Sequence, residues 1–196
     1  MALDPVGRDS PVGGSVLTEP ILVVQRAAEP GADAIYVIYD RRARRLAAVR
    51  RVVRQLQVIG ADSGVQIVLT PPADQSGEVV VTNTAGNEVG RIARDDVFGR
   101  VRFALRSGGR RRGSIHADDL RGWNFAVLDQ DGTEIARITK TWEGLGEALR
   151  ATAHDHVLQV RRPVRDPLRT LVVAAALAVE TACGSPSGAG SSSPGG

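Results

Sequence analysis

Short apolar runs recur along the chain, and turn residues such as Gly, Asp and Asn separate them. Many runs alternate apolar and polar positions, as Val101 to Leu105 does, so that one face of the segment is buried and the other is wet. The runs that we interpret as strands are 21–25, 34–40, 45–52, 65–70, 77–83, 88–94, 99–106, 123–129, 134–140 and 156–160. Regularly spaced short strands are typical of a mainly β sandwich or barrel.

One segment near the C-terminus breaks this pattern. Leu171 to Val179 is apolar on every side of a helix, so no polar face remains for water. The uncharged run 170–179 is far shorter than the roughly 20 residues that a bilayer crossing needs, and Glu180 closes it. We therefore expect a helix that is enclosed by its own domain.

The ends of this helix carry recognisable signals. Asp166 is the expected N-cap, Pro167 the first helical residue and Gly184 the residue that stops the helix, which predicts a helix over 167–183.

Composition sets the expected limits of the domain. Residues 1–14 are poor in apolar side chains and are expected to be disordered, and the Gly/Ser/Pro-rich residues 185–196 are expected to form a flexible tail. The ordered domain is then 15–184, which is long enough to bury a sizeable core.

Three strand pairs share one pattern. Each has an Asp or Asn at the end of an apolar strand, a small residue three positions later, and apolar or small residues at positions six, seven and nine. The three sets are Asp40, Ala43, Leu46, Ala47 and Val49; Asn83, Gly86, Val89, Gly90 and Ile92; and Asp129, Gly132, Ile135, Ala136 and Ile138. The Asp or Asn side chain would cap the turn and Gly would take a positive φ, as in a hairpin. Five matching offsets favour a true repeat over three unrelated hairpins.

These pieces predict one architecture. Roughly a dozen strands in repeated hairpins would enclose a wide space that something must fill. The C-terminal helix is apolar all round and slim because of Ala174, Ala175 and Ala176. We therefore expect a closed antiparallel barrel of about twelve strands that encloses this helix.

The same stretches resemble the phospholipid scramblase and LURP-one-related family, whose members share the tubby C-terminal-like fold. The matching residues are Phe125 to Asp129, Gly132, Ile135 to Ile138, Lys140, Trp142, Gly144, Ala153 to Val157 and the apolar helix, with a weaker match at Leu22 to Gln25 and Tyr36 to Asp40. The resemblance covers about Val16 to Cys183 and implies a twelve-stranded barrel around a central C-terminal helix. It gives Asp129, Gly132 and Trp142 structural roles.

The calcium site of calcium-responsive scramblases is not expected here. Asp155 and Asp166 have the spacing of a twelve-residue calcium loop, but Gln159 and Arg161 stand where carboxylates are needed and Val160 stands in the place of Gly. Because calcium needs six or more oxygen ligands, several of them charged, we predict that this loop binds no metal.

Charge and cysteine content indicate the cellular compartment of the protein. The net charge is +3, and arginine supplies nearly all of the 25 basic residues. The single cysteine, Cys183, excludes an internal disulfide and fits a reducing compartment. The first 14 residues lack the apolar core of a secretion signal, so we expect a cytoplasmic protein, peripheral at the inner face of the plasma membrane.

No catalytic constellation, cofactor motif or metal site stands out. His154 and His156 could begin a metal site, but no third ligand stands at a familiar spacing, so we interpret them as surface or rim histidines. The sequence therefore predicts a protein that is not an enzyme.

Clusters of arginine are the candidate functional residues. They are Arg41, Arg42, Arg44 and Arg45; Arg106, Arg110, Arg111 and Arg112; and Arg161, Arg162 and Arg165. The planar guanidinium suits phosphate, and a basic residue close to an anionic bilayer contributes about 1 kcal/mol. The resemblance to tubby-like domains, which recognise phosphoinositide headgroups, points to the same ligand. An equal alternative to lipid contact is that these arginines lie in solvated turns, where nearby Asp residues offset their charge.

Three functions follow from these features. The first is a membrane-associated domain that contacts anionic phospholipid without turnover. The second is calcium-independent scrambling of phospholipid between leaflets, and the third is non-specific nucleic-acid binding through the arginines. Aromatic residues make up 4% of the chain, so platforms for base stacking are scarce and nucleic acid is disfavoured as a partner. Protein partners are not indicated.

Overall fold

The computed structural model describes residues 14–27, 34–72, 77–95, 101–118, 124–140 and 155–183. They form twelve strands and one helix. The strands are β1 (Ile21–Arg26), β2 (Ala34–Tyr39), β3 (Arg45–Val52), β4 (Gln55–Gly60), β5 (Val65–Thr70), β6 (Glu78–Asn83), β7 (Glu88–Arg94), β8 (Arg102–Ser107), β9 (Arg110–Ala117), β10 (Asn124–Asp129), β11 (Glu134–Thr139) and β12 (His156–Val160), and the helix is α1 (Leu168–Cys183).

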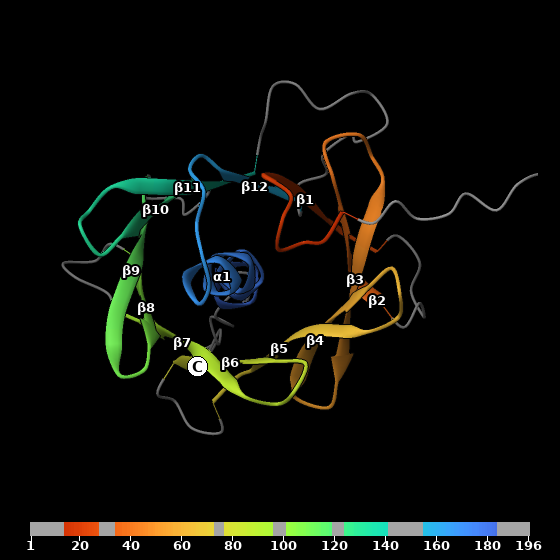
Figure 1. The fold of residues 1–196 in the computed structure, drawn as a ribbon, viewed down its shortest axis with the longest axis horizontal. Coiled ribbons are helices and arrows are strands. Elements are labelled where there is room, and N and C mark those ends of the chain that lie inside the picture. Colours follow the sequence, from red (N-terminus) through yellow and green to blue (C-terminus); the bar gives the residue numbers. More distant parts are fainter. Residues whose placement is uncertain are drawn as a thin grey trace, which may run out of the picture.

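The twelve strands close into one antiparallel barrel. Each strand pairs with its neighbours in sequence, and β1 closes the ring by pairing with β12. Figure 1 looks down the barrel and shows α1 end-on inside the ring of strands. The predicted fold class, a closed barrel around a C-terminal helix, is confirmed.

The helix is buried along its apolar length. Every residue from Leu171 to Val179 is at most 5% exposed, which includes Ala174, Ala175 and Ala176. A side chain at Gly90 of β7 would lie 3.1 Å from Leu171 Cδ1 and 2.1 Å from the Arg106 carbonyl oxygen, so the helix and a neighbouring strand both come close to this backbone. In the second hairpin, the small residue at position seven of the repeat, Gly90, thus makes room for the helix.

The start of the helix differs by one residue from the prediction. α1 begins at Leu168 rather than at Pro167. Asp166 still caps it, because its Oδ1 accepts hydrogen bonds from Thr170 N at 3.0 Å and Thr170 Oγ1 at 2.6 Å.

The three-hairpin repeat forms three nearly identical turns. Asp40, Asn83 and Asp129 each accept, through Oδ1, hydrogen bonds from the backbone N–H groups two and four residues later, at 2.8–3.0 Å. The residues at position three, Ala43, Gly86 and Gly132, have φ values of 61°, 77° and 80°. The same side-chain cap and the same positive φ therefore close each hairpin.

A bulge explains the odd spacing in the repeat. In the first hairpin Ile38 pairs with Ala47 and Tyr39 pairs with Arg45, which leaves Leu46 as an extra residue. The corresponding register shifts leave Val89 and Ile135 extra in the other two hairpins. Positions six and nine of a regular strand would point to opposite faces, but one extra residue corrects the alternation, so both can be apolar.

Two strands were missing from the sequence interpretation. Gln55–Gly60 and Arg110–Ala117 form β4 and β9. Their polar residues, such as the arginines that open β9, concealed the alternation. Trp142, predicted to be structural, lies outside the described residues.

Candidate functional site

The up-and-down topology gathers the arginine clusters at one end of the barrel. At this end lie the turns 40–44, 60–64, 83–87, 107–110 and 129–133, together with the segment 161–167 that leads into α1. We call it the arginine-rich end. All eleven candidate arginines lie in these connections or in the strand residues beside them. The chain therefore brings three distant clusters to one end.

The clusters do not merge into a single patch. The β2–β3 turn and the β8–β9 turn lie across the ring from each other, with four strands between them on either side. Figure 1 shows these two hairpins on opposite sides of α1. The third cluster lies between them, in the segment that connects β12 to α1.

The β2–β3 turn is held by a buried carboxylate. Asp40 is 1% exposed, and its Oδ2 accepts a hydrogen bond from Arg44 Nε at 2.6 Å. Burial raises the pKa of Asp40, but hydrogen bonds from Arg44 and Arg42 outweigh it and hold the pKa below the usual value. Arg44 is thus committed to Asp40, whereas Arg41 and Arg42 are exposed and form no ion pair with a described residue.

A hollow of about 360 Å³ adjoins this turn. It is lined by Glu19, Pro20, Ile21, Asp40, Arg41, Arg42 and Arg44. Two exposed guanidinium groups beside a hollow of this size can bind a phosphate group, while the Glu19 carboxylate in the lining would oppose an anion.

The β8–β9 cluster contains arginines in three states. Arg106 and Arg110 are exposed, and no ion pair holds either of them within the described residues. Arg111 lies 3.6 Å from Asp95. Arg112 is half-buried, and its buried Nε has no hydrogen-bond partner among the described residues. Arg112 is therefore the member least available to a ligand.

The third cluster is mostly free. Arg161 Nη1 lies 3.0 Å from Glu134 Oε1, whereas Arg162 and Arg165 are exposed without an ion pair in the described part of the chain. The pKa of Glu134 is lowered, chiefly by its hydrogen bond from Arg137. Seven candidates thus remain exposed and without an ion pair to a described residue: Arg41, Arg42, Arg45, Arg106, Arg110, Arg162 and Arg165.

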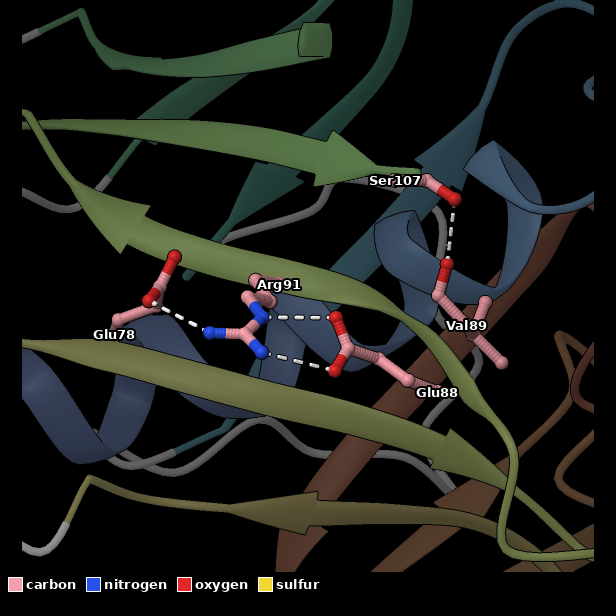
Figure 2. A network of polar contacts seen from close by, with 5 residues as sticks. All are labelled: Glu78, Glu88, Val89, Arg91 and Ser107. Carbon is pink, nitrogen blue, oxygen red and sulfur yellow. Dashed lines mark hydrogen bonds and ion pairs between the residues drawn. The ribbon is translucent and has the colours of Figure 1, made fainter. Parts of the chain in front are cut away.

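Arginines on the outer wall behave differently. Figure 2 shows Arg91 of β7 held between two carboxylates: it binds Glu88 at 2.8 and 3.0 Å and Glu78 at 3.3 Å. In the same view, Ser107 Oγ donates a hydrogen bond to the Val89 carbonyl oxygen at 2.7 Å and ties β8 to the bulge of β7. Arg137 of β11 is likewise paired with Glu134 and Asp118. Arg91 and Arg137 are thus held by neighbouring carboxylates, in contrast to the seven exposed arginines of the arginine-rich end.

One arginine of structural importance was not recognised from the sequence. Arg169, in the first turn of α1, is buried, and it donates hydrogen bonds to the carbonyl oxygens of Leu17 at 2.8 Å, Val16 at 3.3 Å and Glu19. Burial lowers its pKa. The side chain thus fastens the segment before β1 over the start of the helix. The sequence feature that could have revealed this role is the position of Arg169, a charged residue directly before the apolar run of the helix.

The histidine interpretation is wrong for His156. This residue is 3% exposed inside the barrel, and burial lowers its pKa to about 4 despite the opposing effects of the Ala176 backbone and the Asp155 carboxylate. It is two residues from the core residue Leu158 and so lies on the inward face of β12 rather than at a rim. His154 lies outside the described residues.

No metal or membrane-crossing element is found in the described ranges. No cluster of three His, Cys, Asp or Glu side chains there could hold a metal ion. Among the described residues, no helix has the length and apolar content that a bilayer crossing requires.

Comparison with known proteins agrees with the fold. A sequence model of the Scramblase family matches residues 38–182. No curated protein sequence shows significant similarity to the chain. The X-ray structure of the Arabidopsis thaliana protein AT5G01750 is similar over 88% of this chain and all of that chain, with a TM-score of 0.55 and 11% sequence identity. At that identity the similarity shows the fold alone.

Proposed function

Because the chain belongs to the Scramblase family, we propose that it is a membrane-associated domain that contacts anionic phospholipid headgroups through its arginine-rich end and catalyses no reaction. The proposed location is peripheral, at an anionic surface such as the inner face of the plasma membrane. The eleven arginines of the three clusters are proposed as the contact residues, and Arg112 is the least available of them.

The observation that carries the proposal is the contrast between wall and end. Arg91 and Arg137 on the wall are bound by carboxylates at 2.8–3.0 Å. Seven arginines at the end are exposed without an ion pair to a described residue. Unpaired guanidinium groups keep their hydrogen-bond donors for a phosphate, and each basic residue near an anionic bilayer contributes about 1 kcal/mol.

The rigidity of the turns supports the same function. Asp40 fixes the β2–β3 turn through three hydrogen bonds to Arg42 and Arg44, so Arg41 and Arg42 project from a backbone that is already ordered. A preorganised site loses less conformational entropy when a headgroup binds.

Sedimentation with vesicles tests the proposal. The protein is expected to pellet with vesicles that contain phosphatidylserine and to remain in solution with vesicles of phosphatidylcholine alone. Added salt should weaken the binding at this end, because exposed charges are screened beyond a Debye length of about 10 Å at 0.1 M. Equal binding of neutral and anionic vesicles would contradict the proposal.

Two variants locate the contact. The double substitution R41Q/R42Q removes two exposed charges from the β2–β3 turn and should weaken binding to anionic vesicles about tenfold or more. D131N removes an exposed negative charge from the β10–β11 turn at the same end and should strengthen binding slightly. A change of the same sign for both variants would show that the charge of this end does not determine the contact.

Lipid scrambling itself is not part of the proposal. To take part in lipid transfer across a bilayer, α1 would have to leave the barrel. The apolar surface of Leu171 to Val179 would then be exposed, which is unfavourable. A dithionite assay of labelled lipid in the same vesicles measures scrambling directly, and we expect no transfer between leaflets.

A further inference from the structure

The tip of the β3–β4 hairpin exposes two aliphatic side chains. Val52 is 43% exposed and Val53 is 89% exposed, and they are the only exposed large hydrophobic residues among those that the structure describes. Val52 pairs with Gln55, so Val53 and Arg54 form a two-residue loop. A single exposed Val is ordinary, but two adjacent ones at the outermost point of a hairpin form a small apolar tip.

The backbone of this tip is strained. Val53 has a φ of 55°, in the left-handed region that a β-branched residue rarely adopts. Gly is the usual residue at a positive-φ position of a two-residue hairpin loop. A valine at this position therefore costs stability in the folded protein, and no packing compensates for it because the side chain is almost fully exposed.

Basic residues flank the tip. Arg50 and Arg51 precede the valines and Arg54 follows them, and all three are exposed. Arg54 Nη2 donates a hydrogen bond to the Pro72 carbonyl oxygen at 3.0 Å, which holds the loop against the end of β5. The tip is thus a fixed apolar point within a group of positive charges.

We propose that Val52 and Val53 enter the headgroup region of an anionic phospholipid bilayer while the flanking arginines lie at the level of the phosphates. Apolar side chains with adjacent basic residues match this interface, where acyl chains and anionic headgroups meet. A second copy of the chain is a poorer occupant, because two facing tips would bring six arginines together. The inference rests on the proposed function in that it needs an anionic bilayer.

The tip lies at the end of the barrel opposite the arginine-rich end. β3 runs between the two ends, and its eight residues span about 26 Å at about 3.3 Å per residue. One flat bilayer therefore cannot contact both ends at once, so the tip is a second contact that can be tested apart from the first.

The test uses substitutions that separate strain from binding. V53G removes the apolar side chain and relieves the positive φ, so the melting temperature should rise by about 3 °C while binding to phosphatidylserine vesicles in about 1 M salt falls about tenfold. At this salt the Debye length is about 3 Å, so the contacts of the exposed arginines are largely screened. V53L keeps the apolar character and should retain binding.

S63G is the matched control. Ser63 also has a positive φ, of 62°, in the exposed β4–β5 turn at the other end, so its change to Gly relieves similar strain without altering the tip. We expect a higher melting temperature and unchanged binding in high salt. Equal binding of V53G and the parent protein in high salt would overturn the inference, whatever the result for R41Q/R42Q. If R41Q/R42Q has no effect but V53G weakens binding, the proposed arginine contact fails and the tip remains.

Discussion

The interior of the barrel and its arginine-rich end are built on opposite principles. Inside, Leu171 to Val179 are each at most 5% exposed, and even the polar residue His156 is only 3% exposed. At the end, seven arginines are exposed, and the side chains of Asp40, Asn83 and Asp129 hold three of the turns there through hydrogen bonds. The interior therefore determines the fold, whereas the end is free to carry charge for a partner. Substitutions at the arginine-rich end should therefore change phospholipid binding but not stability, and substitutions in the interior should change stability.

The most severe test of the interior is A175D. Ala175 is 0% exposed on a helix that has no polar side, so a carboxylate there would be buried without a partner. We expect a loss of more than about 5 kcal/mol, enough to unfold the domain. Circular dichroism and soluble yield measure this effect.

A85D provides the control for this change. Ala85 lies in the exposed β6–β7 turn, so the same substitution there should leave the circular dichroism spectrum and the yield unchanged. A folded A175D protein as stable as the parent would rule out the enclosed helix.

The buried histidine predicts a pH dependence of stability. Its pKa in the folded protein is about 4, against about 6.5 in the unfolded chain, so the unfolded state binds the proton more readily. His156 therefore contributes stability above about pH 6.5 that is lost progressively as the pH falls toward 4. At about 1.4 kcal/mol per pH unit the loss is about 3 kcal/mol. Urea unfolding at pH 7 and pH 5 measures most of it.

H156Q is the control for this prediction, because glutamine does not titrate. Its free energy of unfolding should change less between pH 7 and pH 5 than that of the parent protein. Equal slopes in the two proteins would show that His156 is not buried in its neutral form.

The turn that begins at Asp129 tests the hairpin repeat. D129A removes an acceptor of two backbone hydrogen bonds, at 3.0 Å from Asp131 N and 2.8 Å from Thr133 N, and should cost about 2 kcal/mol. D131A changes an exposed neighbour whose carboxylate holds no turn bond within the described residues, and should cost almost nothing. Denaturant midpoints distinguish the two, and equal midpoints would remove the capping role of Asp129.

The sequence predicted the interior better than the end. A repeat that begins with Asp40, Asn83 or Asp129 depends on local turn chemistry, and an apolar helix depends on composition, so both could be inferred without coordinates. The sequence did not explain why positions six and nine of the repeat are both apolar. The bulges at Leu46 and Val89 supply the reason.

The features of the arginine-rich end could not be predicted without the three-dimensional arrangement. Arg169 has the same side chain as Arg165, yet the first binds backbone carbonyl groups in the core and the second is exposed. Arg42 and Arg110 are far apart in the sequence, and the topology alone brings them to one end of the barrel. The tip at Val53 carries no motif, because its exposure and its positive φ become visible only in the fold.

The central claim is tested most directly by the variant R41Q/R42Q/R110Q/R162Q, measured at once for melting temperature and for binding to phosphatidylserine vesicles in low salt. All four side chains are exposed and hold no ion pair with a described residue. We predict an unchanged melting temperature and binding weakened by at least about a hundredfold, from about 1 kcal/mol per charge near the surface. Binding equal to that of the parent protein, with the same melting temperature, would contradict the assignment of the arginine-rich end to phospholipid.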